Sequence, residues 1–248
     1  MTDVTEDWLL NEAVKIYQPV KGYRAGLDAL LLSASLPDIG IGRALEVGCG
    51  AGGALFTAAW HLKDTNFVGL ERESLMADMA RCGVDGNGFS GRVEIVEGDL
   101  QQLRDNWENA FDLVFSNPPY FEPGKIQPPI LERSHAYLAD VALKDWLKFM
   151  LFTARPKGRI TLIHRAGCVD EILSYLRTRS GQIEVFPVFS SPDDTAKRVI
   201  VTARKGLRQG EVKLHRGLVM HPVKGEPAYT EQADKILKGA PITALANR

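Results

Sequence analysis

From about residue 42 onward, the chain alternates short apolar runs with helical stretches. Runs typical of buried strands occupy residues 43–47, 66–70, 93–96, 111–115 and 159–163. Helical stretches lie at about 54–62, 74–81, 143–154 and 169–178. Runs of this kind without polar alternation are typical of a parallel sheet that helices cover on both faces. Two last runs, at 183–186 and 199–202, predict a closing antiparallel hairpin.

These elements predict a Rossmann-like three-layer α/β sandwich with a seven-stranded, mostly parallel sheet and an antiparallel edge strand. A length of 248 residues suits one such domain. We assign residues 41–248 to it and residues 1–40 to a short N-terminal extension, in which 14–19 is extended and 27–32 is helical. We expect the extension to pack on the core and to cover the ligand site.

Composition excludes several classes of protein. No apolar run approaches the roughly 18 residues that a membrane span needs, and the acidic opening is unlike a signal peptide, so we expect a cytoplasmic protein. Three dispersed cysteines indicate neither a disulfide framework nor a zinc site. His135, His164, His215 and His221 lack metal spacing, so we expect no metal. The sequence does not indicate an oligomeric state.

The formal charge of −1 conceals an asymmetry. Residues 1–152 carry 13 Lys and Arg against 22 Asp and Glu, a net −9, whereas residues 153–248 carry 17 against 9, a net +8. A basic region can bind a polyanion, although differently charged solvated faces explain the split equally well.

The first chemical motif is the glycine-rich turn after the strand at 43–47. Gly48, Gly50, Gly52 and Gly53 lie between this strand and the following helix, where a backbone without side chains can approach a ligand. Gly48, Gly50 and Gly53 also satisfy the dinucleotide pattern GxGxxG, with Glu71 18 residues later. The turn alone therefore leaves a nicotinamide or flavin oxidoreductase open.

Three acidic residues at successive strand ends favour a cationic cofactor instead. Glu46 ends a buried strand, and a charge there is costly without a cationic partner. S-adenosylmethionine brings an ammonium and a sulfonium, whereas a dinucleotide brings a pyrophosphate that Glu46 would repel. Glu71 can accept hydrogen bonds from ribose hydroxyls and Asp99 from an adenine amino group, although Asp99 could also be a helix N-cap.

The most informative motif is Asn117-Pro118-Pro119-Tyr120, directly after the strand at 111–115. A conjugated amino group is a poor nucleophile because its lone pair is delocalised. The side-chain oxygen of Asn117 and the carbonyl of Pro118 can each accept one N–H hydrogen bond and so aim the nitrogen. The prolines make the turn rigid, and Tyr120 offers a face on which a base can stack. The sequence therefore predicts transfer of a methyl group to an amino nitrogen.

With these motifs, the chain resembles the class I S-adenosylmethionine-dependent amino-methyltransferases. Its opening, Gln18-Pro19 with Gly22-Tyr23-Arg24 and Leu27-Asp28-Ala29-Leu30-Leu31-Leu32, is similar to that of the bacterial family that methylates adenine 37 of a valine tRNA. Segments 159–165 and 197–206 resemble later parts of this family. The resemblance implies S-adenosylmethionine as donor, S-adenosylhomocysteine as product, and RNA as partner. It implies donor contacts from Tyr23, Arg24, Glu46, Gly48, Gly50, Gly52, Glu71, Asp99, Leu100 and Asn117.

The substrate side carries departures and open alternatives. Ala25-Gly26 stands where the family has a bulkier residue followed by Ser, beside Tyr23. Ser134-His135-Ala136 stands where the family pattern has His-Glu, so any role of that glutamate is absent. We expect Lys197, Arg198, Arg204 and Lys205 to contact RNA phosphates. The alternatives are another amino-methyltransferase, acting on a ribosomal guanine or a protein glutamine, then a dinucleotide oxidoreductase, and last a non-catalytic binding module.

Overall fold

The structure is a computed structural model that describes residues 4–21, 24–102, 105–120 and 141–246. The strands are β1 Val4–Leu9, β2 Val14–Pro19, β3 Gly42–Val47, β4 Thr65–Glu71, β5 Val93–Glu97, β6 Phe111–Ser116, β7 Ala154–Arg165, β8 Ser180–Phe189, β9 Ala196–Lys205, β10 Lys213–Leu214 and β11 Leu218–Val219. The α-helices are α1 Leu27–Ala34, α2 Gly53–His61, α3 Ser74–Gly86, α5 Leu143–Thr153, α6 Val169–Arg177, α7 Glu231–Leu237 and α8 Thr243–Ala246. Two short 3₁₀ turns lie at Asp105–Trp107 and Ala166–Cys168.

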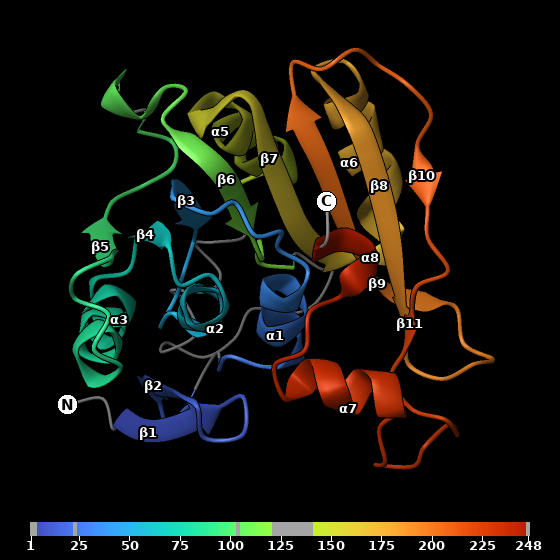
Figure 1. Ribbon diagram of the computed structural model, residues 1–248, viewed down its shortest axis with the longest axis horizontal. Helices are drawn as coiled ribbons and strands as arrows, with labels where there is room; N and C mark the ends of the chain where they lie inside the picture. The colour runs from blue at the N-terminus through green and yellow to red at the C-terminus, as the bar shows by residue number, and fades with distance from the viewer. Residues whose placement is uncertain (1–3, 22–23, 103–104, 121–140, 247–248) are drawn as a thin grey trace.

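One nine-stranded sheet organises the molecule (Figure 1). Its path runs β10-β8-β9-β7-β6-β3-β4-β5, and β11 also pairs with β8. The central pairs from β7 through β6, β3 and β4 to β5 are parallel, whereas β9 is antiparallel to both β7 and β8. The predicted α/β sandwich and its closing hairpin are confirmed.

Two details of the predicted sheet are wrong. The antiparallel strand β9 lies between β7 and β8 and is not an edge strand. The edge beyond β8 is formed by β10 and β11, which raise the strand number above seven. Each of these strands has two residues, too few for any hydrophobic periodicity to appear in the sequence.

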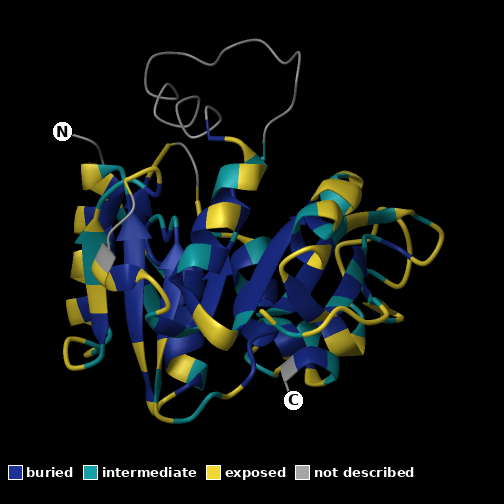
Figure 2. Cartoon of the chain, turned by 90° about the horizontal axis from the view of Figure 1, so that it is seen from above, coloured by how far each residue is buried: buried dark blue, intermediate teal, exposed yellow. Residues whose placement is uncertain are grey.

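Successive side chains of a strand point to opposite faces of the sheet. The apolar side chains therefore form two core clusters, one on each face. In β3, Ala44 belongs to the cluster beneath α1 and α2, whereas Leu45 belongs to the cluster beneath α5 and α6. Figure 2 shows the buried sheet in the middle, with the exposed sides of the helices turned outward. This arrangement is the predicted three-layer sandwich.

The N-terminal residues form a hairpin of β1 and β2 that packs near α2 and α3 (Figure 1). Ile16 of β2 is fully buried in a cluster with Ala51, Met76 and Met79. The hairpin therefore contacts the glycine-rich turn and α3, while its role in covering the ligand site stays a prediction. The strand β1 was not predicted, because its outward residues, including Val4 and Trp8, are exposed and contribute little to a core pattern.

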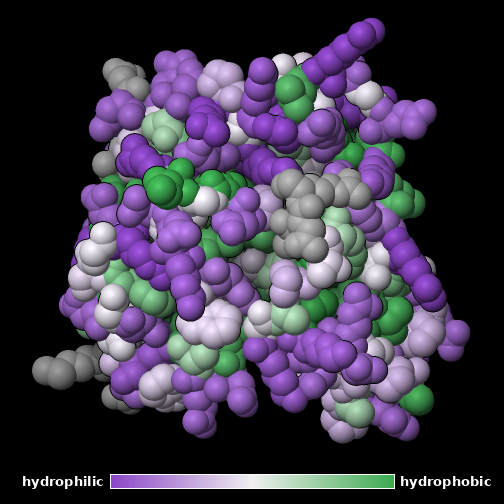
Figure 3. Space-filling model, in the orientation of Figure 1, coloured by the Kyte–Doolittle hydropathy of each residue, from purple (hydrophilic) through white to green (hydrophobic). Residues whose placement is uncertain are grey.

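The face of the molecule seen in Figure 3 is mainly hydrophilic, with apolar side chains in small separate patches. Within the described residues, no helix is both long and apolar enough to cross a membrane.

Candidate active site

The glycine-rich turn between β3 and α2 needs glycine at three positions. Gly48, Gly50 and Gly52 have φ angles of 69°, 55° and 94°, a region that strongly favours glycine. A Cβ at Gly48 would also lie 2.5 Å from the ring of Trp146. The turn thus takes its shape at the carboxyl end of β3, the edge at which sheets of this kind bind ligands.

Glu46 is a buried acid with an unsatisfied oxygen. Its side chain is 2% exposed, and its Oε2 atom has no hydrogen-bond partner among the described residues. Burial raises the pKa of Glu46 well above its usual range, and the nearby charge of Glu71 adds to this effect. A cationic group at this place would relieve the unfavourable charge. Glu46 does not line the adjoining pocket, so its role opposite the positive charge of the donor stays a prediction.

Glu71 organises the same turn from the end of β4. Its Oε2 atom accepts a hydrogen bond from Gly50 N at 2.8 Å, and its Oε1 atom accepts from the amides of Arg72 and Glu73, each at 2.8 Å. Burial raises its pKa, while these three amides act in the opposite direction. Each carboxylate oxygen has a further lone pair, so Glu71 can still accept from a ribose hydroxyl, as predicted.

A pocket opens beside Glu71 at the ends of β3, β4 and β5. It contains about 310 Å³ of empty space, part of it open solvent. Its lining comprises Val47, Gly48, Leu70, Glu71, Arg72, Gly98, Asp99, Leu100, Val141 and Trp146. The structure therefore brings together four of the residues predicted to contact the donor, namely Gly48, Glu71, Asp99 and Leu100.

Asp99 has structural partners within this pocket. Its Oδ1 atom accepts from Gln101 N at 2.9 Å, and its Oδ2 atom lies 3.4 Å from Arg72 Nη1. The bond from Gln101 N closes a turn, and no helix begins in the described residues 98–102, so the structure does not make Asp99 the helix N-cap that the sequence left open. Arg72 and Trp146 were not predicted, yet both line the pocket, and Trp146 Nε1 is buried with no partner among the described residues. Only tertiary packing brings α5 over the glycine turn, so the sequence offered no signal for Trp146.

The Asn117-Pro118-Pro119-Tyr120 motif follows β6 directly, at the same edge of the sheet. Ser116 Oγ donates to Val47 O at 2.7 Å and so joins the end of β6 to the end of β3. Tyr120 Oη lies 3.1 Å from Asn117 Oδ1. The motif thus stands beside the glycine turn, as an amino-group acceptor site requires.

Three further side chains surround Tyr120. Its Oη atom lies 2.7 Å from Asp28 Oδ2, the Arg198 guanidinium lies over its ring at 4.6 Å, and the His164 ring meets it at 5.0 Å and 87°. His164 is buried, which lowers its pKa to about 4. A neutral ring at physiological pH makes His164 a packing partner of Tyr120. The sequence indicated none of these contacts, because the four residues come from distant segments.

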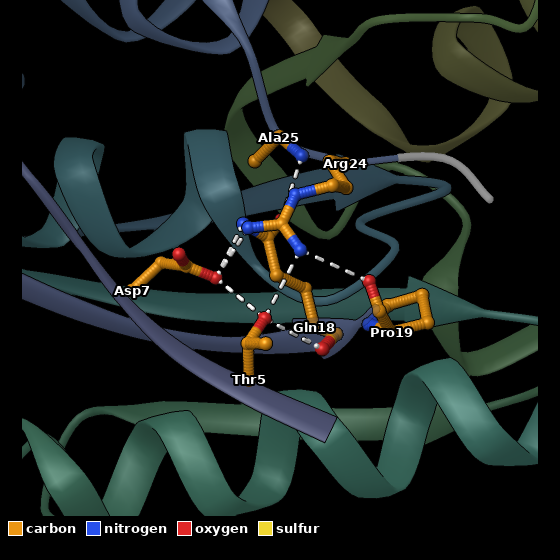
Figure 4. A network of polar contacts seen from close by, with 6 residues as sticks. All are labelled: Thr5, Asp7, Gln18, Pro19, Arg24 and Ala25. Atoms are coloured by element: carbon orange, nitrogen blue, oxygen red, sulfur yellow. Dashed lines mark hydrogen bonds and ion pairs between the residues drawn. The ribbon is translucent and has the colours of Figure 1, made fainter. Parts of the chain in front are cut away.

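The N-terminal segment that leads into α1 is held by the polar network in Figure 4. Arg24 Nη2 lies 2.7 Å from Asp7 Oδ2, and Arg24 Nη1 donates to Thr5 Oγ1 at 3.0 Å and to Pro19 O at 3.2 Å. Gln18 Oε1 accepts from Ala25 N at 2.9 Å. Arg24 therefore binds the hairpin, and its predicted donor contact stays a prediction.

The sequence also singles out Ala25, Tyr23 and the segment Ser134-His135-Ala136. The Ala25 Cβ lies 2.5 Å from where a Cβ on Gly53 would stand, so Ala25 packs against the start of α2. Tyr23 and the segment Ser134-His135-Ala136 lie outside the described residues.

The four basic residues predicted to contact RNA lie at the two opposite ends of β9. Arg198 pairs in register with Arg165 at the end of β7, whereas Arg204 pairs with Arg159, six residues earlier in β7. Six residues of strand separate them by roughly 20 Å. Lys197 is exposed beside Arg198, so only this end of β9 adjoins the acceptor motif.

Arg204 and Lys205 have structural partners at the carboxyl end of β9, away from the acceptor motif. Arg204 Nε donates to Lys157 O at 2.9 Å, and Lys205 Nζ donates to Ala154 O at 2.8 Å and to Asn109 Oδ1 at 2.7 Å. The structure thus does not bring these two residues to the predicted site.

The sequence and the structure both resemble methyltransferases. The family described as a methyltransferase domain matches residues 44–140. The tRNA1(Val) (adenine(37)-N6)-methyltransferase of Yersinia pestis (strain Pestoides F) is 36% identical over 101 residues, which are 40% of this chain and 41% of the relative. A protein of the same name from Yersinia pseudotuberculosis serotype O:3 (strain YPIII) is also 36% identical over 101 residues, which are 40% of this chain and 40% of the relative. The matched segment spans about two fifths of the length of these curated relatives.

Two solved structures share the fold. A predicted O-methyltransferase from Agrobacterium tumefaciens is 27% identical, with a TM-score of 0.70 over 86% of this chain and 97% of its own. A structure described as M. jannaschii TYW2 in complex with AdoMet is 10% identical, with a TM-score of 0.58 over 82% of this chain and 86% of its own. The likeness at 10% identity concerns the fold alone. Together these similarities confirm the predicted class of fold.

Proposed function

We propose that this chain, which carries a class I S-adenosylmethionine-dependent methyltransferase domain, methylates the exocyclic amino group of an adenine in RNA, at position 37 of a valine tRNA. The observation that carries the proposal is the Asn117-Pro118-Pro119-Tyr120 motif at the end of β6, at the same edge of the sheet as the pocket that Glu71 and Asp99 line. The curated relatives with this activity supply the identity of the base and of the RNA. A tRNA substrate would place the reaction in the cytoplasm.

The acidic residues of the site suit the methyl donor. When bound, S-adenosylmethionine supplies a methyl group on a positively charged sulfur, and S-adenosylhomocysteine is the product. Glu46 would oppose the positive charge, Glu71 would accept from the ribose hydroxyls, and Asp99 would accept from the adenine amino group. The same carboxylates would repel a pyrophosphate, which disfavours the dinucleotide alternative.

The acceptor side holds and orients a nitrogen. Asn117 Oδ1 and Pro118 O would each accept one N–H of the substrate amino group, which aims the nitrogen lone pair at the methyl carbon. The methylated nitrogen is acidic and loses a proton afterwards, so no general base is needed. The low pKa of His164, about 4, leaves its ring neutral throughout.

Methyl transfer from labelled donor into RNA and protein of a deletion strain tests the proposal. We expect the label in N6-methyladenosine at position 37 of valine tRNA and its loss when this adenine is replaced by guanine. Label in a ribosomal guanine, a protein glutamine or a hydroxyl oxygen would show that adenine is not the methyl acceptor. Methylation of a hydroxyl oxygen is included because a protein of similar structure is described as a predicted O-methyltransferase.

Charge reversal at Lys197 tests the RNA contact. Lys197→Glu should weaken tRNA binding and reduce the slope of log affinity against log salt concentration by roughly one unit, because one phosphate contact is lost. Filter binding at several salt concentrations measures both. Lys63→Glu is the matched control, because Lys63 is exposed at the opposite edge, two residues before β4. Equal slopes for the two variants would remove Lys197 from the RNA interface.

A further inference from the structure

Asp28 lies at the meeting point of three distant segments of the chain. Its Oδ2 atom lies 2.7 Å from Tyr120 Oη and 3.0 Å from Arg198 Nε. Asp28 belongs to the first turn of α1, Tyr120 to the acceptor motif and Arg198 to β9. The Asp28 side chain is 19% exposed and that of Arg198 is 31% exposed, so the pair is partly shielded from water.

We propose that Asp28 and Arg198 are positioning residues of the acceptor site. They hold Tyr120 in place from two sides and thereby set the geometry at Asn117 and the ring face that a substrate base can use. The inference rests on the proposed function, since it assumes that Asn117 and Tyr120 serve the methyl acceptor.

The hydroxyl proton of Tyr120 has two oxygen atoms within reach. Tyr120 Oη carries a single proton but lies within hydrogen-bond distance of both Asp28 Oδ2, at 2.7 Å, and Asn117 Oδ1, at 3.1 Å. The carboxylate is the nearer and the stronger acceptor, because its charge strengthens the bond. Asp28 thus draws the tyrosine proton toward itself. Tyr120 then competes less with a substrate amino group for Asn117 Oδ1.

The ring of Tyr120 is in contact with Arg198. The guanidinium carbon of Arg198 lies 4.6 Å from the ring centroid and over its face. Stacked arginine is a rigid plane that lysine cannot replace. Arg198 therefore occupies one face of Tyr120, and a substrate base must use the other face or stack on the guanidinium. This contact gives Arg198 a different role from the predicted phosphate contact.

The N-terminal hairpin fixes the position of Asp28. The Gln18 side chain accepts from Ala25 N, three residues before Asp28, and Arg24 pairs with Asp7 of β1 (Figure 4). Ala25 also packs against Gly53. The hairpin therefore anchors the segment that carries Asp28 to the turn on which the donor is proposed to bind.

A double-mutant cycle between Asp28 and Tyr120 tests the proposal. The variants are Asp28→Ala, Tyr120→Phe and both together, with kcat and KM measured on valine tRNA. Asp28→Ala should lower kcat by about 10- to 100-fold, the effect of losing a hydrogen bond to a charged group. In the Tyr120→Phe background, it should change kcat by less than about threefold, because coupled residues are not additive. Asp28→Asn retains an acceptor oxygen and should restore part of kcat.

The role of Arg198 has its own test. Arg198→Lys keeps the charge and loses the planar group, so we expect a loss of kcat with tRNA affinity and its salt slope unchanged. A phosphate contact would give the reverse result, with kcat retained in the lysine variant and salt dependence altered in Arg198→Gln.

Controls separate positioning from folding. Every variant should bind the donor within about twofold of wild type and unfold at a similar temperature. Asp112→Asn alters an Asp–Arg pair at the opposite end of β6, where Asp112 Oδ1 lies 2.5 Å from Arg155 Nη1, and should leave kcat unchanged. An additive cycle, or a rise in KM with kcat retained, overturns the positioning role and leaves adenine methylation standing. A wild type without adenine methylation overturns the proposed function, and this inference with it.

Discussion

Replacing Asn117 with alanine is expected to reduce kcat for methyl transfer by about 100- to 1,000-fold, with donor affinity within about twofold of wild type. The estimate corresponds to the loss of one preorganised polar contact to the reacting group. Without Asn117 Oδ1, the amino nitrogen keeps its delocalised lone pair and is no longer aimed at the methyl carbon. Asn117 follows β6 and is partly exposed, so the substitution leaves no large cavity.

Rapid-quench measurement of transfer to valine tRNA, with calorimetry for the donor, would separate the two quantities. Asn66→Ala is a suitable control, because Asn66 is an exposed residue of β4 near its amino end. Turnover of Asn117→Ala within about threefold of wild type would show that this side chain does not orient the acceptor. A parallel loss of donor affinity would instead place Asn117 in the donor site.

The strands that the sequence predicted best are those buried on both faces. Runs such as 111–115 have no polar alternation, since helices cover both sides of β6. Because the carboxyl ends of parallel strands share one edge, the order of the motifs also predicted that Glu71, Asp99 and Asn117 would gather there. Periodicity therefore located both the core of the fold and the donor side of the site.

The contacts around Tyr120 could not be predicted in this way. Asp28 and Arg198 are 170 positions apart in the chain, and their 3.0 Å contact depends on β9 lying between β7 and β8. Periodicity indicates which face of a strand is buried but not which strand is its neighbour.

The charge asymmetry was informative only in part. The hairpin of β8 and β9 is basic, but the charges of β9 lie at its two ends, with Lys197 and Arg198 at one end and Arg204 and Lys205 at the other. Lys205 is partly buried, with a lowered pKa caused by burial, and it donates to backbone carbonyls at the far edge. A count of charges in sequence does not separate such structural lysines from exposed ones such as Lys197.

Glu46→Gln is expected to stabilise the donor-free protein and to weaken donor binding by about 10- to 100-fold, the range for a hydrogen bond to a charged group. Burial raises the pKa of Glu46 well above its usual range. A carboxyl group with a raised pKa in the folded state stabilises the fold below its unfolded pKa, and this contribution is lost as pH rises through the folded pKa. The donor-free wild type should therefore lose stability with rising pH in this window, whereas Glu46→Gln should not.

Binding of a cationic donor should reverse this dependence. The positive charge favours the carboxylate, so donor binding to the wild type should release a proton and strengthen as pH rises through the pKa of Glu46. Thermal unfolding with and without donor, from about pH 5 to about pH 9, measures the stability, and calorimetry in buffers of different ionisation enthalpy counts the proton. Glu94→Gln serves as control, since Glu94 is an exposed residue of β5. If Glu46→Gln binds the donor as wild type does and unfolds at the same temperature, this buried carboxylate neither carries a charge in the donor-free protein nor meets the donor, and the positive charge of S-adenosylmethionine must be opposed elsewhere.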